Sequence, residues 1–167
     1  MMTRPIPADL YAKLQHIQPS RDGEMRYYPC RVRLRDGRTL DRVYVQPREP
    51  YLTYWGMMPD EDPGKHSIPI EEIVDLEDSP DRLPPLFANL IYEAGESGMG
   101  YTLFRVEFRD GTSIPVITGN AVDFVVFPAH VGAADVVGVR PHEGRDDDPQ
   151  PAPDYAWAIF DGVQPLA

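Results

Sequence analysis

A serine surrounded by glycines, in the segment Gly95-Glu-Ser-Gly-Met-Gly, comes closest to a catalytic motif in this sequence. The nucleophile elbow of hydrolases has the form G-x-S-x-G and lies between a strand and a helix. Here Met99 stands where the second glycine belongs, and the expected order is a helix, then Ser97, then a strand. The spacing matches neither a P-loop nor a dinucleotide-binding motif. We therefore interpret the segment as a glycine-rich helix end, with Ser97 as a nucleophile the alternative.

The histidines are candidates for a base or a metal ligand, and they are His16, His66, His130 and His142. None is adjacent to a candidate nucleophile, so a Ser–His or Cys–His pair could only be created by the fold. Two acidic segments, 60–62 with His66 and 146–148 with His142, contain groups that metals bind. Because their spacing matches neither an EF-hand loop nor HExxH, we interpret them as solvated acids. The sequence predicts no metal and no cofactor.

Three arginines form a stripe on one predicted strand. Arg31, Arg33 and Arg35 alternate with Val32 and Leu34, which places the three guanidinium groups on one face. Such a stripe could bind phosphate, RNA or an acidic peptide. We expect it instead to pair with acids on the adjacent strands.

Aromatic residues gather in the first half of the chain, as Tyr27, Tyr28, Tyr51, Tyr54 and Trp55. Small barrels of the SH3 type bind proline-rich peptides on aromatic surfaces, so these rings are candidates for a binding groove. The alternative is that most of them are core. Residues 51–55 place apolar side chains on both faces of a predicted strand, which is typical of a strand covered on both sides.

Charge and composition limit the classes of function. The 167 residues carry a formal net charge of −11, from 27 acidic and 16 basic residues. This charge disfavours nucleic-acid binding and suits a basic protein partner. Cys30 is the only cysteine, so no internal disulfide can form, and we expect a cytoplasmic protein. No run approaches the length of a membrane helix and the N-terminus has no apolar signal region, so we expect neither membrane insertion nor secretion.

Hydrophobic periodicity predicts the elements that must position these residues. It predicts a helix within 7–17, a hairpin over 31–45, a third strand at 51–55, short strands within 68–76 and a helix at 86–94. The hairpin turn is Asp36-Gly37, because glycine accepts the positive φ that the turn requires. A polar connection over 142–153 precedes an apolar C-terminal strand at 155–160. The 19 prolines favour such short elements over long helices.

The second half of the chain repeats this pattern. Arg105–Ile114 aligns without a gap on Arg31–Leu40, with five identical positions. Residues 123–127 then take the place of 51–55, and residues 135–139 the place of 72–76. The order of strands resembles the SH3-like and Sm-like small barrels, over about 28–79 and 101–140. The resemblance is one of pattern and implies a fold class only.

These observations predict a mainly β, α+β chain of two similar SH3-like or Sm-like barrel units with two short helices. The expected division is 1–84, the first helix and barrel unit, and 85–167, the linking helix, second unit and C-terminal strand, with one composite domain as the alternative. We expect a non-catalytic protein-interaction module that binds a protein partner through a groove, an open sheet edge or its acidic surface. The candidate binding residues in its first half are Arg31, Arg33, Arg35, Tyr51, Tyr54 and Trp55. The alternative is a small-molecule-binding protein or hydrolase with Glu93, Glu96 and Ser97 near the junction of the halves. The sequence leaves oligomeric state and the partner's identity open.

Overall fold

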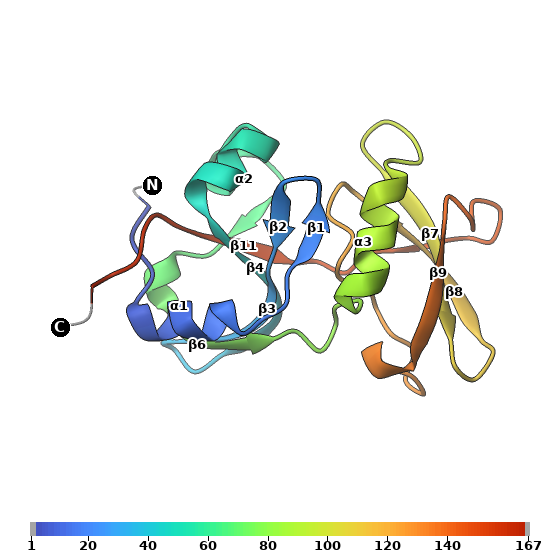
Figure 1. Ribbon diagram of the computed structural model, residues 1–167, viewed down its shortest axis with the longest axis horizontal. Coiled ribbons are helices and arrows are strands. Elements are labelled where there is room, and N and C mark those ends of the chain that lie inside the picture. The colour runs from blue at the N-terminus through green and yellow to red at the C-terminus, as the bar shows by residue number, and fades with distance from the viewer. Residues whose placement is uncertain (1–2, 166–167) are drawn as a thin grey trace. The chain divides into compact units, whose positions relative to one another are not determined.

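The computed structural model describes residues 3–165 and shows a mixed α+β fold. Figure 1 shows the order of its elements. The helices are α1 (Ala8–Gln15), α2 (Arg48–Trp55) and α3 (Pro85–Ala94), and the short 3₁₀ helices are η1 (Pro59–Glu61), η2 (Ile70–Glu72) and η3 (Ala133–Asp135). The chain forms two compact units. The first contains the residues up to Pro19, Met25–Ser79 and the chain from Tyr155 onward, and the second contains Ser20–Glu24 and Pro80–Asp154.

The first unit is built on a five-stranded sheet with the order β5-β11-β4-β3-β6. The strands are β3 (Pro29–Leu34), β4 (Thr39–Pro47), β5 (His66–Ser67), β6 (Ile73–Asp78) and β11 (Ala156–Phe160). β3 pairs antiparallel with β4 and β6, as expected for the hairpin and the strand within 68–76. β11 runs parallel to β4, so the predicted C-terminal strand exists but joins the first sheet rather than the second half to which the sequence assigned it.

The second unit is built on a four-stranded sheet with the order β10-β8-β7-β9. Its strands are β7 (Thr102–Phe108), β8 (Ser113–Thr118), β9 (Val136–Pro141) and β10 (Gln150–Pro151). β7 pairs antiparallel with β8 and β9, and β10 runs parallel to β8. This unit also contains β1 (Ser20–Asp22), beside α3, whereas β2 (Met25–Tyr27) belongs to the first unit.

Both predicted hairpins are confirmed, and their turns have the same geometry. Leu34 N donates to Arg38 O at 2.8 Å in the first, and Phe108 N donates to Thr112 O at 2.9 Å in the second. Gly37 and Gly111 adopt φ of 92° and 88°, a region that side chains with a Cβ rarely enter. The Asp-Gly pairs therefore specify both turns locally.

The predicted strand at 51–55 is wrong, because these residues form the second half of α2. The helix ends at Gly56, whose φ of 86° is left-handed and whose N–H donates to Leu52 O. Helical spacing places Tyr51 and Trp55 four residues apart on one face, where their rings stack. The prediction of a strand gave more weight to the aromatic content of 51–55 than to the helical spacing of Tyr51 and Trp55.

The corresponding strand at 123–127 is also wrong, since Phe124 forms only an isolated bridge with Arg82. Without a third strand at either place, the SH3-like pairing is not found. Across residues 3–165 both sheets remain open, because β5, β6, β9 and β10 each pair on one side only.

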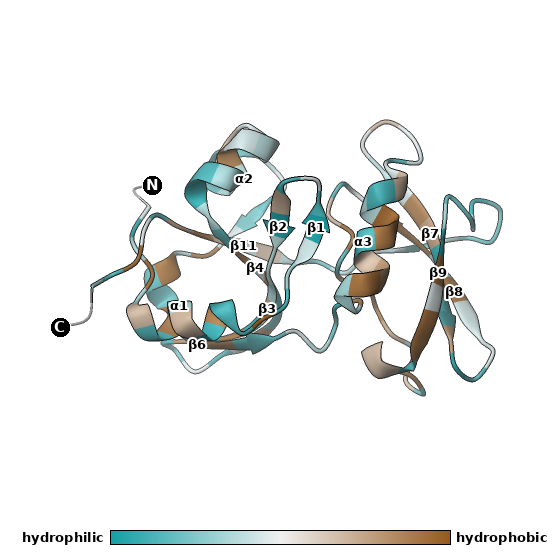
Figure 2. Cartoon of the chain, in the orientation of Figure 1, coloured by the Kyte–Doolittle hydropathy of each residue, from teal (hydrophilic) through white to brown (hydrophobic). Residues whose placement is uncertain are grey.

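Hydrophobic side chains form the buried core. Figure 2 shows that hydrophobic residues occur along strands of both sheets and along parts of α1 and α3. In the first unit, Leu10 and Leu14 of α1 pack in the cluster that contains Val32 and Val45. In the second, α3 buries Ala88 and Ile91. The predicted helices at 7–17 and 86–94 are therefore confirmed. No helix within the described chain has the length and apolar character needed to cross a membrane.

Candidate functional site

The first unit holds a lysine ammonium against three aromatic rings. Lys65 Nζ lies 4.3 Å from the ring centroid of Trp55, 5.6 Å from that of Tyr51 and 5.9 Å from that of Trp157. These distances are within the range of cation–π attraction, in which the negative face of a ring stabilises a cation. We call the three rings of Tyr51, Trp55 and Trp157 around this ammonium the aromatic cage.

Two elements far apart in the sequence form the cage. α2 provides Tyr51 and Trp55, whose rings are nearly parallel at 11°, and β11 provides Trp157. The Trp157 ring is inclined by 61° to Tyr51 and by 62° to Trp55, so it forms a wall across the stacked pair. Tyr51 and Trp157 are almost fully buried. Packing therefore holds the Tyr51 and Trp157 rings in place.

Acidic groups complete the surroundings of the ammonium. Lys65 Nζ lies 3.0 Å from Asp62 Oδ2 and donates to Tyr51 Oη at 3.2 Å. Burial raises the pKa of Tyr51, and the negative charge of Asp62 raises it further, so the phenol stays neutral at physiological pH. Asp60 and Glu61 lie in η1, which contacts β5 and directly precedes the turn that contains Asp62 and Lys65. The region is thus suited to cations.

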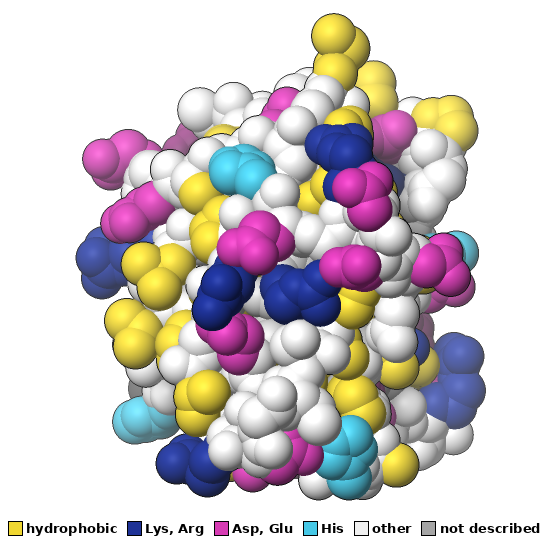
Figure 3. Space-filling view, turned by 90° about the vertical axis from the view of Figure 1, so that its right-hand side faces the viewer, with side chains coloured by type: hydrophobic (Ala, Val, Ile, Leu, Met, Phe, Trp, Pro, Cys, Tyr) yellow, Lys and Arg dark blue, Asp and Glu magenta, His cyan; other side chains and the backbone are white. Residues whose placement is uncertain are grey.

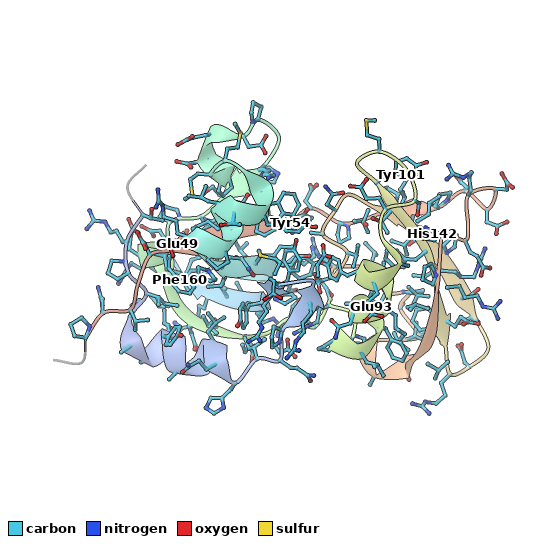
Figure 4. All side chains as sticks on the ribbon, turned by 45° about the horizontal axis from the view of Figure 1, so that its top comes forward. Glu49, Tyr54, Glu93, Tyr101, His142 and Phe160 are labelled. Atoms are coloured by element: carbon cyan, nitrogen blue, oxygen red, sulfur yellow. The ribbon has the colours of Figure 1, made fainter. Side chains whose placement is uncertain are left out.

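The sequence named Tyr51, Tyr54 and Trp55 as binding candidates, and the structure brings two of them into the cage. Tyr54 lies on the exposed side of α2, 45% exposed, with its ring centroid 5.8 Å from that of Trp55 (Figure 4). Lys65 and Trp157 were missed. Two features of the sequence could have pointed to them. Lys65 is one of only two lysines in the sequence, and the two tryptophans could share one site. The indole Nε1 of Trp55 is buried with no hydrogen-bond acceptor among the described residues.

One arginine of the stripe, Arg31, pairs with acids on adjacent strands, as the sequence analysis expected of all three. Arg31 Nε donates to Asp41 on β4 at 2.7 Å, and Arg31 also lies 3.5 Å from Glu77 on β6. The bond to Asp41 raises the pKa of Arg31. Arg35 Nε donates to the carbonyl of Glu71. Arg33 is exposed and lines a shallow hollow with Asp75 and Glu77. Acids thus alternate with the arginines, which weakens the case for an anionic ligand.

In the second unit the fold creates a Ser–His pair that the sequence could not reveal. Ser97 Oγ lies 2.7 Å from His142 Nδ1, and His142 Nε2 lies 3.1 Å from the carbonyl oxygen of Ala94. A carbonyl can only accept, so Nε2 carries a proton, and in that tautomer of the imidazole Nδ1 is the acceptor for the Ser97 hydroxyl. The carbonyl oxygen of Leu103, 3.3 Å from Ser97 Oγ, is a second acceptor for the same hydroxyl. His142 is also held at a φ of 65°, unusual for a residue with a Cβ.

Other hydrogen bonds weaken this pair as a catalytic site. The N–H of Leu103 donates to Ser97 Oγ at 2.8 Å, which reduces the electron density available for attack. The N–H groups of Ser97 and Gly98 both point to the carbonyl of Tyr101, so neither is available for an oxyanion. Glu96 accepts from Gly100 N, within the same loop. The arrangement fixes the loop 95–101 to the ends of α3 and β9.

Glu93, the remaining predicted site residue, is exposed on α3 (Figure 4). Figure 3 shows basic side chains beside acidic ones on a face of the second unit. Ion pairs of the second unit join opposite charges: Arg140 lies 3.2 Å from Glu107, and Arg105 pairs with Asp147.

The described residues contain no group of three metal-binding side chains. No protein family, curated protein or solved structure matches the chain. The geometry of its own residues is therefore the basis for a functional proposal.

Proposed function

We propose that this chain is a non-catalytic protein-interaction module that binds a basic segment of a protein partner on the first unit. The observation that carries this proposal is Lys65, whose ammonium rests on Trp55 beside Asp62. The surroundings that stabilise this lysine suit a lysine of another chain equally well. Tyr54, exposed next to Trp55, extends the aromatic surface for such a segment.

The charge balance supports a basic partner. Lys13, Arg31, Arg105 and Arg140 all pair with acids of the same chain, so these basic groups are partly neutralised. The formal charge of −11 arises because acidic residues outnumber the basic residues of the chain that could pair with them. Such an excess attracts a basic partner over long distances and discriminates against acidic ones.

Titration of the full chain with hexalysine, followed by tryptophan fluorescence, tests the proposal. We expect saturable binding that weakens strongly between about 50 and 300 mM salt, because the Debye length shortens. Hexaglutamate should not bind. Neutralising Asp60→Asn with Glu61→Gln should weaken hexalysine binding several-fold, whereas Asp146→Asn with Asp148→Asn removes the same charge from the second unit and should have little effect. Absence of saturable binding, or equal effects of the two double variants, contradicts the proposal.

A second candidate function is a hydrolase that uses Ser97, favoured by the 2.7 Å contact with His142 Nδ1. A fluorophosphonate probe distinguishes it from the interaction module. The module predicts no labelling, because Leu103 N–H occupies the Ser97 oxygen. Labelling that disappears in both Ser97→Ala and His142→Ala would establish the hydrolase instead.

We further infer that the two sheets are copies of one internal repeat. Support comes from equivalent backbone bonds: Arg35 N donates to Glu72 O at 2.9 Å, and Arg109 N donates to Asp135 O at 2.7 Å. In the first sheet the 3₁₀ helix η2 leads directly into β6, and in the second sheet η3 leads directly into β9. The turn segments 35–38 and 109–112 differ only in Arg38 and Thr112. Arg38→Thr combined with Thr112→Arg should therefore leave stability nearly unchanged, as measured by urea unfolding, and a large loss would contradict the repeat.

A further inference from the structure

We propose that the aromatic cage is a site for a methylated ammonium group, and that Lys65 is its internal competitor. This inference rests on the proposed function and names the group of the partner that the first unit recognises. The external ligand is a methylated lysine side chain of the partner. Lys65 leaves the cage when this group enters.

The cage is better matched to a methylated than to a plain ammonium. Its walls are three rings in two orientations, and among the described residues Tyr51 Oη and Asp62 Oδ2 lie within bonding distance of Lys65 Nζ. A plain ammonium has three N–H donors and is strongly hydrated. A trimethylammonium group has no N–H donor and spreads its charge over methyl groups that contact ring faces directly. Aromatic surroundings of this kind are a known solution for such cations.

Lys65 can leave without disturbing the fold. Its side chain is at the rim of the cage, 19% exposed, and ends a turn in which Lys65 N donates to Asp62 O. Gly64, before it, has a φ of 90°, and β5, after it, contains only two residues. The four-carbon stem can rotate while the backbone stays in place. Asp62, Tyr51 and the tryptophans then remain to receive the ligand.

The chain contains built-in reporters for the wild-type test. Its only lysines are Lys13 and Lys65, so the two εCH₂ groups can be assigned in a ¹³C NMR spectrum. Ring currents should shift the Lys65 signal upfield, whereas Lys13, paired with Asp75, serves as the control. Tetramethylammonium chloride, compared with sodium chloride at equal ionic strength, should move the Lys65 signal towards that of Lys13. A Lys65 signal that stays in place at saturating tetramethylammonium overturns the inference.

Variants test the competition directly, and fluorescence of Trp55 and Trp157, the only tryptophans, reports on the cage. Lys65→Ala should bind tetramethylammonium at least about tenfold more tightly than the wild type, a difference of about 1.4 kcal/mol. Lys65→Met should show no such gain, because its side chain fills the space. Trp55→Ala in the Lys65→Ala background should abolish binding. Equal affinity of Lys65→Ala and the wild type would show that Lys65 is a structural contact only.

Further ligands identify the source of the methylated group. A lysine-rich peptide with one trimethyllysine should bind the wild type about tenfold more tightly than its unmethylated form, and more tightly than choline. Hexalysine binding without this preference overturns the inference and leaves the proposed function intact. Tetramethylammonium or choline binding without any peptide binding supports the cage and overturns the protein partner.

Discussion

The two units share a hairpin and a strand order, but they differ in what they add to it. In the first, β4 continues into α2 and a long segment that carries Lys65, and in the second, β8 continues into irregular chain before η3. The added parallel strands differ in the same way: β11 is wholly buried and contains Trp157, whereas β10 is short and exposed. A shared sheet therefore supports different sites, because the inserted segments and the added strand provide the side chains.

The two sites also differ in the interactions that hold them together. The aromatic cage surrounds a cation with large buried rings, so its walls are part of the hydrophobic core. The Ser97–His142 pair is a hydrogen-bonded contact between two polar side chains near the surface. We therefore expect substitutions in the cage wall to cost far more stability than substitutions in the pair.

The largest expected effect is that of Trp157→Ala. Trp157 is 1% exposed and contacts the rings of Tyr51, Trp55 and Tyr44, so its removal leaves a large cavity. We expect the free energy of unfolding to fall by about 3–5 kcal/mol, measured by urea denaturation. A loss below about 1 kcal/mol would mean that the cage wall is not part of the core.

Ser97→Ala should cost less, about 1–3 kcal/mol, because the N–H of Leu103 loses its acceptor. Urea denaturation of this variant beside Trp157→Ala measures the contrast between the two sites directly. If Ser97→Ala proved the more damaging of the two, the polar pair would be the more important site for stability.

A comparison of His142→Ala with His142→Gly separates two opposing contributions. Both variants lose the bond to Ser97 and the contact with the Ala94 carbonyl, at about 1 kcal/mol. Glycine also adopts the φ of 65° more easily than a residue with a Cβ, by about 1 kcal/mol. We therefore expect His142→Gly to have a higher melting temperature than His142→Ala. The reverse order would show that the backbone at this position is unstrained.

The smallest expected effect concerns the aspartates of the two hairpin turns. Hydrogen bonds from the Arg38 backbone and side chain lower the pKa of Asp36, and those from the Thr112 side chain and backbone lower the pKa of Asp110. Because both pKa values are lowered by folding, the stabilisation is present above the ordinary value of 3.8 and is lost as the pH falls through the lowered values.

Asp36→Asn and Asp110→Asn should therefore each lower the melting temperature slightly at pH 7. The difference from the wild type should disappear in strongly acidic solution. A difference that persists there in only one variant would show that the two turns are not equivalent.

Local signals in the sequence were sufficient for much of the fold. The Asp36-Gly37 turn predicted the first hairpin, and the spacing of Leu10 and Leu14 predicted α1. The segment 51–55 was assigned to a strand because aromatic residues are common in strands, although Tyr51 and Trp55 also have helical spacing. Only packing against Trp157 decides between the two, since that contact requires both rings on one face.

By itself, the sequence determined the acidic charge, the two Asp-Gly hairpins and the amphipathic helices, because each depends on residue type or on neighbours within a few positions. Tertiary structure alone decided that Trp157 joins α2 around Lys65 and that His142 meets Ser97. Those contacts join residues separated by 92 and 45 positions in the chain. Their formation depends on β11 pairing with β4 and on β9 pairing with β7, and no local pattern encodes which strands become neighbours.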